Sequence, residues 1–352
     1  MKFFYRIILK KIFDIIYGKI TKFGKKKNQE NLKKKNLKFY NKSYKFFEIK
    51  NGRIFTDCNT NVAYITQNNQ LTNFSFQQNK DKLSSINHNV VLRYGTPKIK
   101  KKINGNVLSL VQGASGNNYW HWLFDLLPKV EILSVNKKIN HFDYYYVPKL
   151  NKYIIDTLKI YGIKEKQLIN SQKYKHLEAS KIFFLENIYL KKGSFQKQFE
   201  NVPRIIVKTI RNKFLKYKNK KFYHKKVFID RSDSKYSHYQ FYNNDLIIQK
   251  LKKKKFGIYR LSKLSIFDQI SLFNSSKVVL GLHGAGFANI IFCKKKTKVY
   301  EILRKNEIRR NAIRTISNLT GLRHTKVIIK RYKYFEGYNQ IIFDKKYYDI
   351  FK

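Results

Sequence analysis

The 352-residue sequence predicts an α/β protein with two domains, each built on a parallel sheet with helices on its faces. A domain holds about 100 to 200 residues, so a chain of this length is expected to contain two. From residue 106 to residue 330, short apolar runs of strand length alternate with segments of helical periodicity, which is typical of doubly wound sheets. A basic stretch over residues 216–226 interrupts this alternation and predicts a passage between domains.

The predicted organisation has four parts. Residues 1–37 form a basic amphipathic helix and a tether, and residues 336–352 form a tail. Between them lie an N-terminal α/β domain over residues 38–205 and a C-terminal α/β domain over residues 206–335.

Composition excludes several classes of protein. Apolar residues make up 43% of the chain and aromatic residues 16%, which excludes a wholly disordered chain. Two cysteines exclude a disulfide framework and a multi-cysteine zinc module. The 75 Lys and Arg against 22 Asp and Glu give a formal charge of +53, which favours an anionic partner. The codon usage of an AT-rich genome would produce the same excess, since Asn, Ile, Tyr and Phe are abundant as well.

The first twenty residues are amphipathic. Apolar residues recur at helical spacing with basic residues between them; the apolar ones are Phe4, Ile8, Ile12, Ile15 and Ile16, and the basic ones are Lys2, Arg6, Lys10 and Lys11. These charges argue against a secretory signal, and no run of 18 apolar residues predicts a transmembrane helix. Two interpretations are open: a helix lying in the surface of an anionic bilayer, or a helix packed on its own domain.

The N-terminal domain begins with strand-like segments and continues with alternating elements. Residues 38–81 have the pattern of short strands, with turns at Asn51-Gly52 and Asn68-Asn69. Farther along the chain, we expect strands at 106–111, 143–147 and 181–185, helices at 119–133 and 151–162, and a glycine turn at 113–116.

The C-terminal domain follows a helix expected at 203–217, which has a proline near its first turn. Its strands are expected at 227–230, 257–261, 278–282, 298–303 and 326–330, and its helices at 243–254, 265–274, 286–292 and 307–319.

One motif runs from Val278 to Asn289, where a strand leads through glycines into a helix. Glycines let the backbone approach a ligand, and the first N–H groups of a helix favour a phosphate. His283 lies at the carboxyl end of the strand, where open α/β sheets bind ligands. Glu301, on the next strand, could accept hydrogen bonds from ribose hydroxyls. A nucleotide site is therefore predicted; the alternative is a tight turn in which His283 caps the helix.

The candidate nucleotide-binding residues are Arg231, His283, Gly284, Ala285, Gly286, Asn289 and Glu301. Arg231 follows a predicted strand and could neutralise a phosphate, although a solvated surface arginine is the alternative. The glycines begin like a dinucleotide fingerprint, but Asn289 occupies the place of its third glycine, which argues against an NAD-dependent enzyme. We expect Gln269 at the surface, and Cys58 and Cys293 as small buried residues.

A second motif covers residues 117–128. On a helix, Asn118, His121, Trp122 and Asp125 share one side, at i, i+3, i+4 and i+7. A hydrogen bond between His121 and Asp125 would fix the imidazole tautomer, and either residue could then act as a general base towards a sugar hydroxyl. Trp122 could stack on a sugar. The alternative is a helix start capped by the asparagine, with a half-buried polar pair.

Several motifs of metal and cofactor enzymes are missing from the sequence. It holds no HExxH, no GxxxxGK[ST], no nucleophile elbow and no DxD, so neither a metal nor a cofactor is implied.

These segments resemble glycosyltransferase family 61, which includes capsular polysaccharide biosynthesis proteins, plant xylosyltransferases and eukaryotic protein O-GlcNAc transferases. The matching pieces are residues 118–133, 227–234, 264–292 and 299–303. The family usually has an Arg and then Asn-Glu after the strand at 227–230; here Asn243 matches, without the Arg and the Glu. The resemblance implies a GT-B fold of two facing Rossmann-like domains, a nucleotide sugar bound mainly by the C-terminal one, and an inverting reaction without a required metal.

The function expected from the sequence is transfer of a sugar from a nucleoside diphosphate, with a UDP-sugar as first candidate, to a glycan acceptor of capsular or cell-surface polysaccharide. His121 and Asp125 are the candidate catalytic residues, and Asn118 and Trp122 the candidate acceptor contacts. A cytoplasmic enzyme at the inner face of the plasma membrane, with a lipid-linked acceptor, would suit the positive charge. The alternatives are a basic nucleic-acid-binding protein, for which no recognition motif is present, and an NAD-dependent oxidoreductase.

Overall fold

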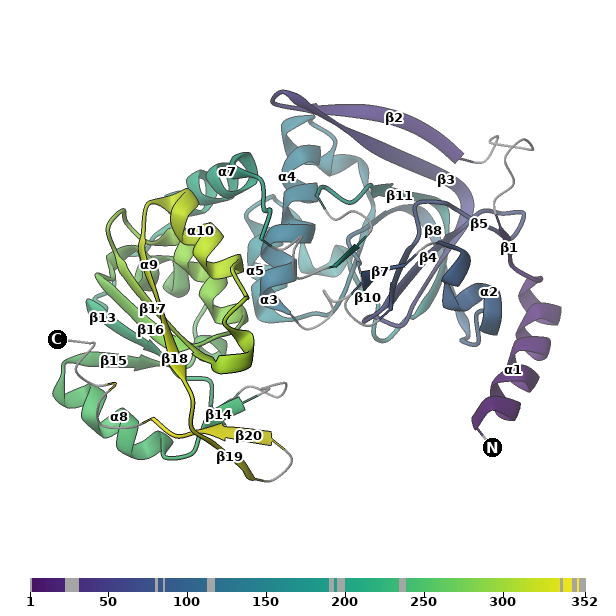
Figure 1. Ribbon diagram of the computed structural model, residues 1–352. Helices are drawn as coiled ribbons and strands as arrows, with labels where there is room; N and C mark the ends of the chain where they lie inside the picture. The colour runs from purple at the N-terminus through teal and green to yellow at the C-terminus, as the bar shows by residue number, and fades with distance from the viewer. Residues whose placement is uncertain are drawn as a thin grey trace. The chain divides into compact units, whose positions relative to one another are not determined.

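The computed structural model covers residues 1–352 and describes residues 2–22, 32–79, 82–84, 86–112, 118–189, 193–194, 200–233, 239–335, 338–343 and 347. The chain forms two compact units, an N-terminal unit of residues 1–199 and a C-terminal unit of residues 200–352 (Figure 1). The predicted glycine turn at 113–116 lies outside the described residues. Of the described helices, none combines the length and the apolar character that crossing a bilayer requires.

One mixed sheet forms the centre of the N-terminal unit, with the strand order β10-β9-β8-β11-β3-β4-β6-β7-β12. In addition, β2 pairs with β3, and β5 joins β1 to β4. The strands are β1 (Thr21–Lys22), β2 (Leu32–Phe39), β3 (Lys42–Thr56), β4 (Asn61–Ile65), β5 (Gln70–Leu71), β6 (Phe76–Asn79), β7 (Lys82–Leu83), β8 (Lys100–Ser109), β9 (Tyr144–Val147), β10 (Leu168–Asn170), β11 (His176–Leu185) and β12 (Gly193–Ser194).

Only part of this sheet has the predicted parallel pairing. Strands β10, β9, β8 and β11 pair parallel with one another in this order, and three of them overlap the strands predicted at 106–111, 143–147 and 181–185. The prediction of a parallel sheet is wrong for β2, β3, β4, β6, β7 and β12, which pair antiparallel. Consecutive strands joined by short turns can only form hairpins, whereas parallel pairing needs long crossovers.

The two predicted turns of this region have different outcomes. The turn at Asn68-Asn69 is confirmed, because Asn69 has a φ of 57° between β4 and β5. The turn at Asn51-Gly52 is wrong, because β3 continues through both residues. Asn51 takes a φ of 44° there, while the residues on either side keep one register with β11. Asn tolerates the left-handed region, so a single such residue fits within a long strand.

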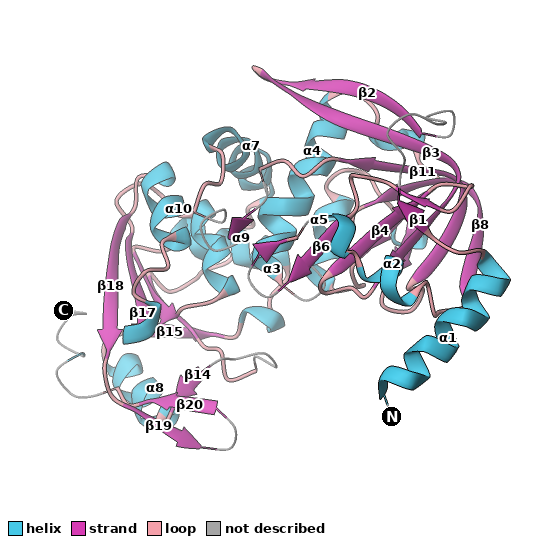
Figure 2. Cartoon of the chain, turned by 45° about the vertical axis from the view of Figure 1, so that its right-hand side comes forward, coloured by secondary structure: helices cyan, strands magenta, loops and turns pink. Residues whose placement is uncertain are grey.

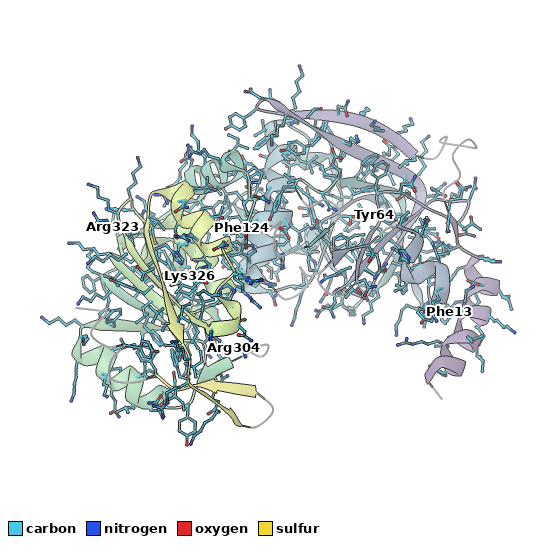
Figure 3. All side chains as sticks on the ribbon, in the orientation of Figure 1. Phe13, Tyr64, Phe124, Arg304, Arg323 and Lys326 are labelled. Atoms are coloured by element: carbon cyan, nitrogen blue, oxygen red, sulfur yellow. The ribbon has the colours of Figure 1, made fainter. Side chains whose placement is uncertain are left out.

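Helices pack on this sheet and on one another (Figure 2). They are α1 (Lys2–Tyr17), α2 (Val90–Tyr94), α3 (Tyr119–His121), α4 (Leu127–Val135) and α5 (Lys152–Lys159), with short turns η1 (Ile86–His88), η2 (Trp122–Leu126), η3 (Ile139–His141) and η4 (Glu165–Gln167). In the core, Tyr64 lies flat on Phe184 with ring centroids 3.8 Å apart; Figure 3 labels Tyr64.

The C-terminal unit holds a five-stranded, all-parallel sheet in the order β15-β13-β16-β17-β18, as predicted. Its strands are β13 (Lys226–Ile229), β15 (Phe256–Tyr259), β16 (Val278–Leu282), β17 (Lys298–Arg304) and β18 (Arg323–Ile329). A small second sheet contains β14 (Tyr239–Phe241), β20 (Tyr338–Ile341) and β19 (Tyr332–Phe335). The helices are α7 (Arg204–Phe214), α8 (Asn244–Lys253), α9 (Ile266–Ser275) and α10 (Ala312–Thr320), with turns η5 (Leu215–Tyr217), η6 (Leu261–Lys263), η7 (Ala285–Phe292) and η8 (Lys305–Glu307).

The strand order gives this sheet a topological switch point. The chain passes from β13 to β15 on one side, and then crosses to β16 on the other side of β13. Ligands of doubly wound sheets bind in the crevice outside the carboxyl ends of the strands at such a point. Arg231 follows β13 and His283 follows β16, so the predicted nucleotide motif lies at the switch point.

Gly281 in β16 leaves room for Ile229 of the neighbouring strand β13. A Cβ at this position would lie 3.1 Å from the Cβ of Ile229 and 3.5 Å from the ring of Phe287 in η7. We expect Gly281→Ala to lower the free energy of unfolding by about 1 to 3 kcal/mol, since it overpacks a dense interior. Urea unfolding followed by circular dichroism measures this loss. Ile229→Ala should cost less in the Gly281→Ala background than in the wild type, because a smaller side chain can shift away from the added methyl group; equal costs would contradict crowding at this contact.

Candidate functional site

Two side-chain clusters carry the chemistry that the sequence predicts, one in each unit. In the C-terminal unit, the cluster joins the carboxyl end of β16, the middle of β17 and the amino end of β18. His283 follows β16, Glu301 lies in β17, and His324 lies in β18. Glu301 stands beside Gly281 in the register, and His324 stands beside Val299, so the three side chains are on one face of the sheet.

Glu301 holds two imidazoles. Its Oε1 pairs with Nδ1 of His283, and its Oε2 lies 2.7 Å from Nε2 of His324. The carboxylate is buried, with 1% of the residue exposed, while His283 keeps 16% of its side chain exposed. Both carboxylate oxygens therefore have imidazole partners, and His283 is the member of the cluster that meets solvent.

The pKa of Glu301 follows from these contacts. Burial alone would raise the pKa of the carboxyl, but the hydrogen bonds from His283 and His324 outweigh it and lower the pKa below the usual 4.5. An ionised carboxylate only accepts hydrogen bonds, so Nδ1 of His283 and Nε2 of His324 both carry hydrogens. The cluster thus fixes the tautomer of His283 whenever that imidazole is neutral.

Arg231 lies against the glycine bend. Its guanidinium donates to the backbone carbonyl of His283, and a Cβ on Gly284 would lie 2.6 Å from the guanidinium carbon. Any larger residue at position 284 must therefore displace Arg231. The first N–H groups of η7, at Ala285 and Gly286, begin beside this cation, which makes the bend an electropositive place.

Asn289 and Gln269 support the bend from inside the unit. Asn289 is fully buried, and its amide donates to Oε1 of Gln269 at 2.9 Å and to the carbonyl of Gly286 at 3.2 Å. Gln269 donates in turn to the carbonyls of Leu261 and Leu264. The expectation of a surface Gln269 is wrong, because this amide joins α9 to η7. The direct ligand contact expected of Asn289 does not fit a fully buried side chain.

In the N-terminal unit, the second motif forms one helical run with a wider turn in the middle. α3 passes into the π-helical turn η2, and α4 follows. Pro128, in the first turn of α4, has no N–H to donate to the carbonyl of Phe124, which favours a widened turn before it. Phe124 is fully buried (Figure 3). Such turns are frequent at functional sites.

His121 and Asp125 meet across this turn, as predicted. Nδ1 of His121 lies 2.7 Å from one oxygen of Asp125, and the hydroxyl of Tyr189 donates to the other. Asp125 is 2% exposed. Both of its oxygens are engaged, so Asp125 is suited to orienting the imidazole.

Lys129 lies one turn farther along the helical run and is also buried. Its ammonium donates to the carbonyl of Leu185 at 3.3 Å. Burial lowers the pKa of Lys129 to about 8, while the negative charges of Asp125 and Glu186 act in the opposite direction. At neutral pH the lysine is protonated, so its charge balances that of the buried carboxylate.

The two candidate acceptor contacts of this motif have local roles. Trp122 is fully buried, and its indole N–H donates to Oγ1 of Thr157 in α5 at 2.9 Å. A ring without an exposed face cannot stack on a sugar, so the contact expected of Trp122 does not fit this structure. Asn118 caps α3, with its side-chain oxygen accepting from the N–H of Trp120 at 3.0 Å.

Cys58 and Cys293 are free and buried, as expected. Within the described residues, no group of three or more His, Cys, Asp or Glu side chains has the arrangement of a metal site. An open cavity of about 1020 Å³ beside β15 reaches Asp230 and Arg260, whose guanidinium pairs with Asp230 at 2.8 Å. None of His283, Gly284 or Glu301 lines it.

Residues 119–300 match the family model of glycosyltransferase 61, and this span is just over half of the chain. The chain belongs to glycosyltransferase family 61. The resemblance drawn from the sequence is thereby confirmed, and family membership implies a transferase with a sugar donor and an acceptor. The match begins at the first residue of α3 and ends one residue before Glu301. No curated protein matches the chain.

Three residues of these clusters in this glycosyltransferase were not predicted from the sequence. His324 reaches Glu301 from β18, and Tyr189 reaches Asp125 from beyond β11. Both contacts join residues far apart in the chain, so no sequence spacing predicts them. Lys129 could have been found, because its position four residues after Asp125 places both on one helical side.

The lowered pKa of Glu301 predicts a pH dependence of stability. The group contributes stability that is present above the unfolded-state pKa and is lost as the pH falls through the lowered folded-state pKa. The difference in free energy of unfolding between the wild type and Glu301→Gln should therefore shrink as the pH falls below 4.5. Urea unfolding over a series from about pH 7 to about pH 3 measures it. Asp245→Asn, at an exposed position of α8, is the control. If the difference in free energy of unfolding between the wild type and Glu301→Gln stays constant over this pH series, that result contradicts the argument.

Proposed function

We propose that this glycosyltransferase transfers a sugar from a nucleoside diphosphate, with UDP as first candidate, to a hydroxyl of a glycan acceptor, with inversion at the anomeric carbon. The observation that carries the proposal is the cluster at the switch point of the C-terminal unit, within a chain of this family. There, a guanidinium, an oriented imidazole and the start of a helix lie side by side.

The proposed donor site uses these three groups for the diphosphate. Arg231 and the N–H groups of Ala285 and Gly286 contact phosphate oxygens, and Gly284 leaves room for the backbone to approach them. His283 acts as the imidazolium, which donates from Nε2 to the departing diphosphate and neutralises its charge, while Nδ1–H stays on Glu301. Glu301 then acts on the donor through His283, since both of its oxygens already have partners. Asn289 holds the bend in place.

The proposed base is His121. Asp125 holds the proton of His121 on Nδ1, which leaves the basic lone pair on Nε2. Asp125 is the positioning residue, because Tyr189 and His121 occupy its two oxygens. The opposite assignment would require a carboxylate that is 2% exposed to exchange a partner for the acceptor.

The proposed reaction is a single displacement at the anomeric carbon. His121 takes the proton of the acceptor hydroxyl as its oxygen forms a bond to the anomeric carbon. The bond from that carbon to the diphosphate oxygen breaks on the opposite side, and its electron pair leaves with the nucleoside diphosphate. The cationic groups of the switch point receive this charge, so the proposed reaction does not call on a metal ion. The proposed acceptor belongs to capsular or cell-surface polysaccharide.

The donor site predicts which variants lose nucleotide binding. Arg231→Gln and His283→Gln should each weaken UDP binding about tenfold or more, because each removes a charge-assisted hydrogen bond to phosphate. Isothermal titration with UDP, with and without EDTA, measures the affinity, and EDTA should leave it unchanged.

Arg323→Gln is the matched control, because this exposed arginine begins β18, an edge strand of the sheet, at its amino end (Figure 3). Equal affinities for wild type and both site variants would overturn the donor site. Salt-sensitive binding of random DNA together with no UDP binding would favour a nucleic-acid-binding protein.

The base assignment predicts a different pattern for the N-terminal unit. His121→Gln should keep the UDP affinity and lower kcat by about 10² to 10⁴-fold, since only proton transfer is lost. Sugar transfer to an acceptor glycan, followed by UDP release, measures kcat. His141→Gln, at an exposed position, is the control. If His121→Gln keeps most of the rate while Asp125→Asn abolishes it, the carboxylate is the base and the assignment fails.

A further inference from the structure

The first helix is docked on the N-terminal unit by only one of its sides. The guanidinium of Arg6 lies over the ring of Tyr94, 5.3 Å from its centroid, and Tyr17 meets His176 edge-on with centroids 5.0 Å apart. The Tyr17 hydroxyl also accepts from the N–H of Lys100 at 3.1 Å. Phe13, labelled in Figure 3, packs on Tyr17 from within the same side. Figures 1 and 2 both show α1 at the margin of this unit, next to α2.

The opposite side of α1 is apolar and uncovered. Tyr5, Ile8, Ile12, Ile15 and Ile16 recur at helical spacing, and we call them the α1 stripe. Ile8, Ile12, Ile15 and Ile16 are 44%, 45%, 85% and 58% exposed. A surface helix ordinarily turns its apolar stripe to the core and its polar side to water. Here the apolar side faces solvent, so packing on the domain does not account for the four isoleucines of the stripe, which the sequence predicted together with Phe4.

Positive charge accompanies the α1 stripe. Lys11 is exposed beside it, and Lys19 and Lys22 are exposed just after the helix. Asp14 is the one acidic residue between positions 5 and 22, and it lies on the docked side in an ion pair with Lys10. The surroundings of the stripe are therefore cationic, in a chain whose formal charge is +53.

We propose that α1 lies in the surface of a bilayer that contains anionic lipids. The α1 stripe enters the boundary of the acyl chains, and Lys11, Lys19 and Lys22 meet the acidic headgroups. A second copy of the chain would bring the same cations against one another, whereas an anionic bilayer matches both the apolar and the charged part of this side. The inference does not depend on the transfer reaction proposed above.

The test must separate insertion of the stripe from adsorption by charge, because a protein this basic is attracted to any anionic vesicle. Salt separates the two: at about 0.5 M, charges are screened beyond about 4 Å, while burial of apolar side chains persists. The full chain is mixed with vesicles of phosphatidylcholine and phosphatidylglycerol at low and high salt, and vesicle flotation measures the bound fraction.

The wild type should float at both salt concentrations, with less binding to phosphatidylcholine alone. Ile12→Gln with Ile15→Gln should bind at least about tenfold more weakly at high salt, because two apolar side chains no longer leave water. Glutamine is a good helix former, so α1 itself is retained. Lys11→Gln with Lys19→Gln should weaken low-salt binding about fivefold per charge.

The matched control is Leu246→Gln with Ile308→Gln, at positions that are 45% and 50% exposed in the C-terminal unit. It should float like the wild type. The proposal is overturned if the α1 variant also floats like the wild type at high salt. It is equally overturned if sedimentation without vesicles finds that the wild type is a dimer and that the Ile12→Gln, Ile15→Gln variant is a monomer. A second copy of the chain would then cover the stripe.

Discussion

The carboxylate of Glu301, shared between the imidazoles of His283 and His324, is the interaction on which the C-terminal unit's chemistry depends. A buried charge is expensive unless it is paired and fully hydrogen-bonded, and this one accepts from both imidazoles. The pairing fixes which nitrogen of His283 carries hydrogen and holds the ring at the end of β16. Arg231 donates to the carbonyl of His283 and lies against Gly284, so the imidazole, the glycine bend and Arg231 stay together.

The N-terminal unit repeats this logic with different residues. Asp125 is again a buried carboxylate that orients an imidazole, and Tyr189 takes the place of the second histidine. Lys129 supplies the compensating charge, and its lowered pKa shows that burial disfavours the protonated form. In both clusters, the carboxylate is buried and both of its oxygens are engaged, so it is suited to orienting the histidine next to it. His283 keeps 16% of its side chain exposed, whereas His121 is itself buried, with 6% of the residue exposed.

Local sequence patterns predicted much of this fold, and long-range contacts supplied the rest. The strand, glycine and helix signals from Val278 to Asn289 placed β16 and η7 correctly, because each depends on neighbouring residues. The antiparallel half of the first sheet was missed, since pairing partners are set by packing over long distances. Trp122 was assigned to the wrong environment for the same reason: helical spacing shows that residues share a side, and only the fold shows what covers that side. His324 completes its cluster through strand register, which no motif records.

The tautomer and ligand response of His283 test the central claim most directly. Side-chain ¹⁵N NMR of histidine-labelled protein, with signals assigned by His283→Gln, reports which ring nitrogen carries hydrogen and which rings respond to UDP. We expect hydrogen on Nδ1 of His283, and a UDP-dependent change at His283 that greatly exceeds any change at the exposed His88 and His141. A neutral His283 with hydrogen on Nε2 alone, or a UDP response confined to the exposed histidines, would contradict the account.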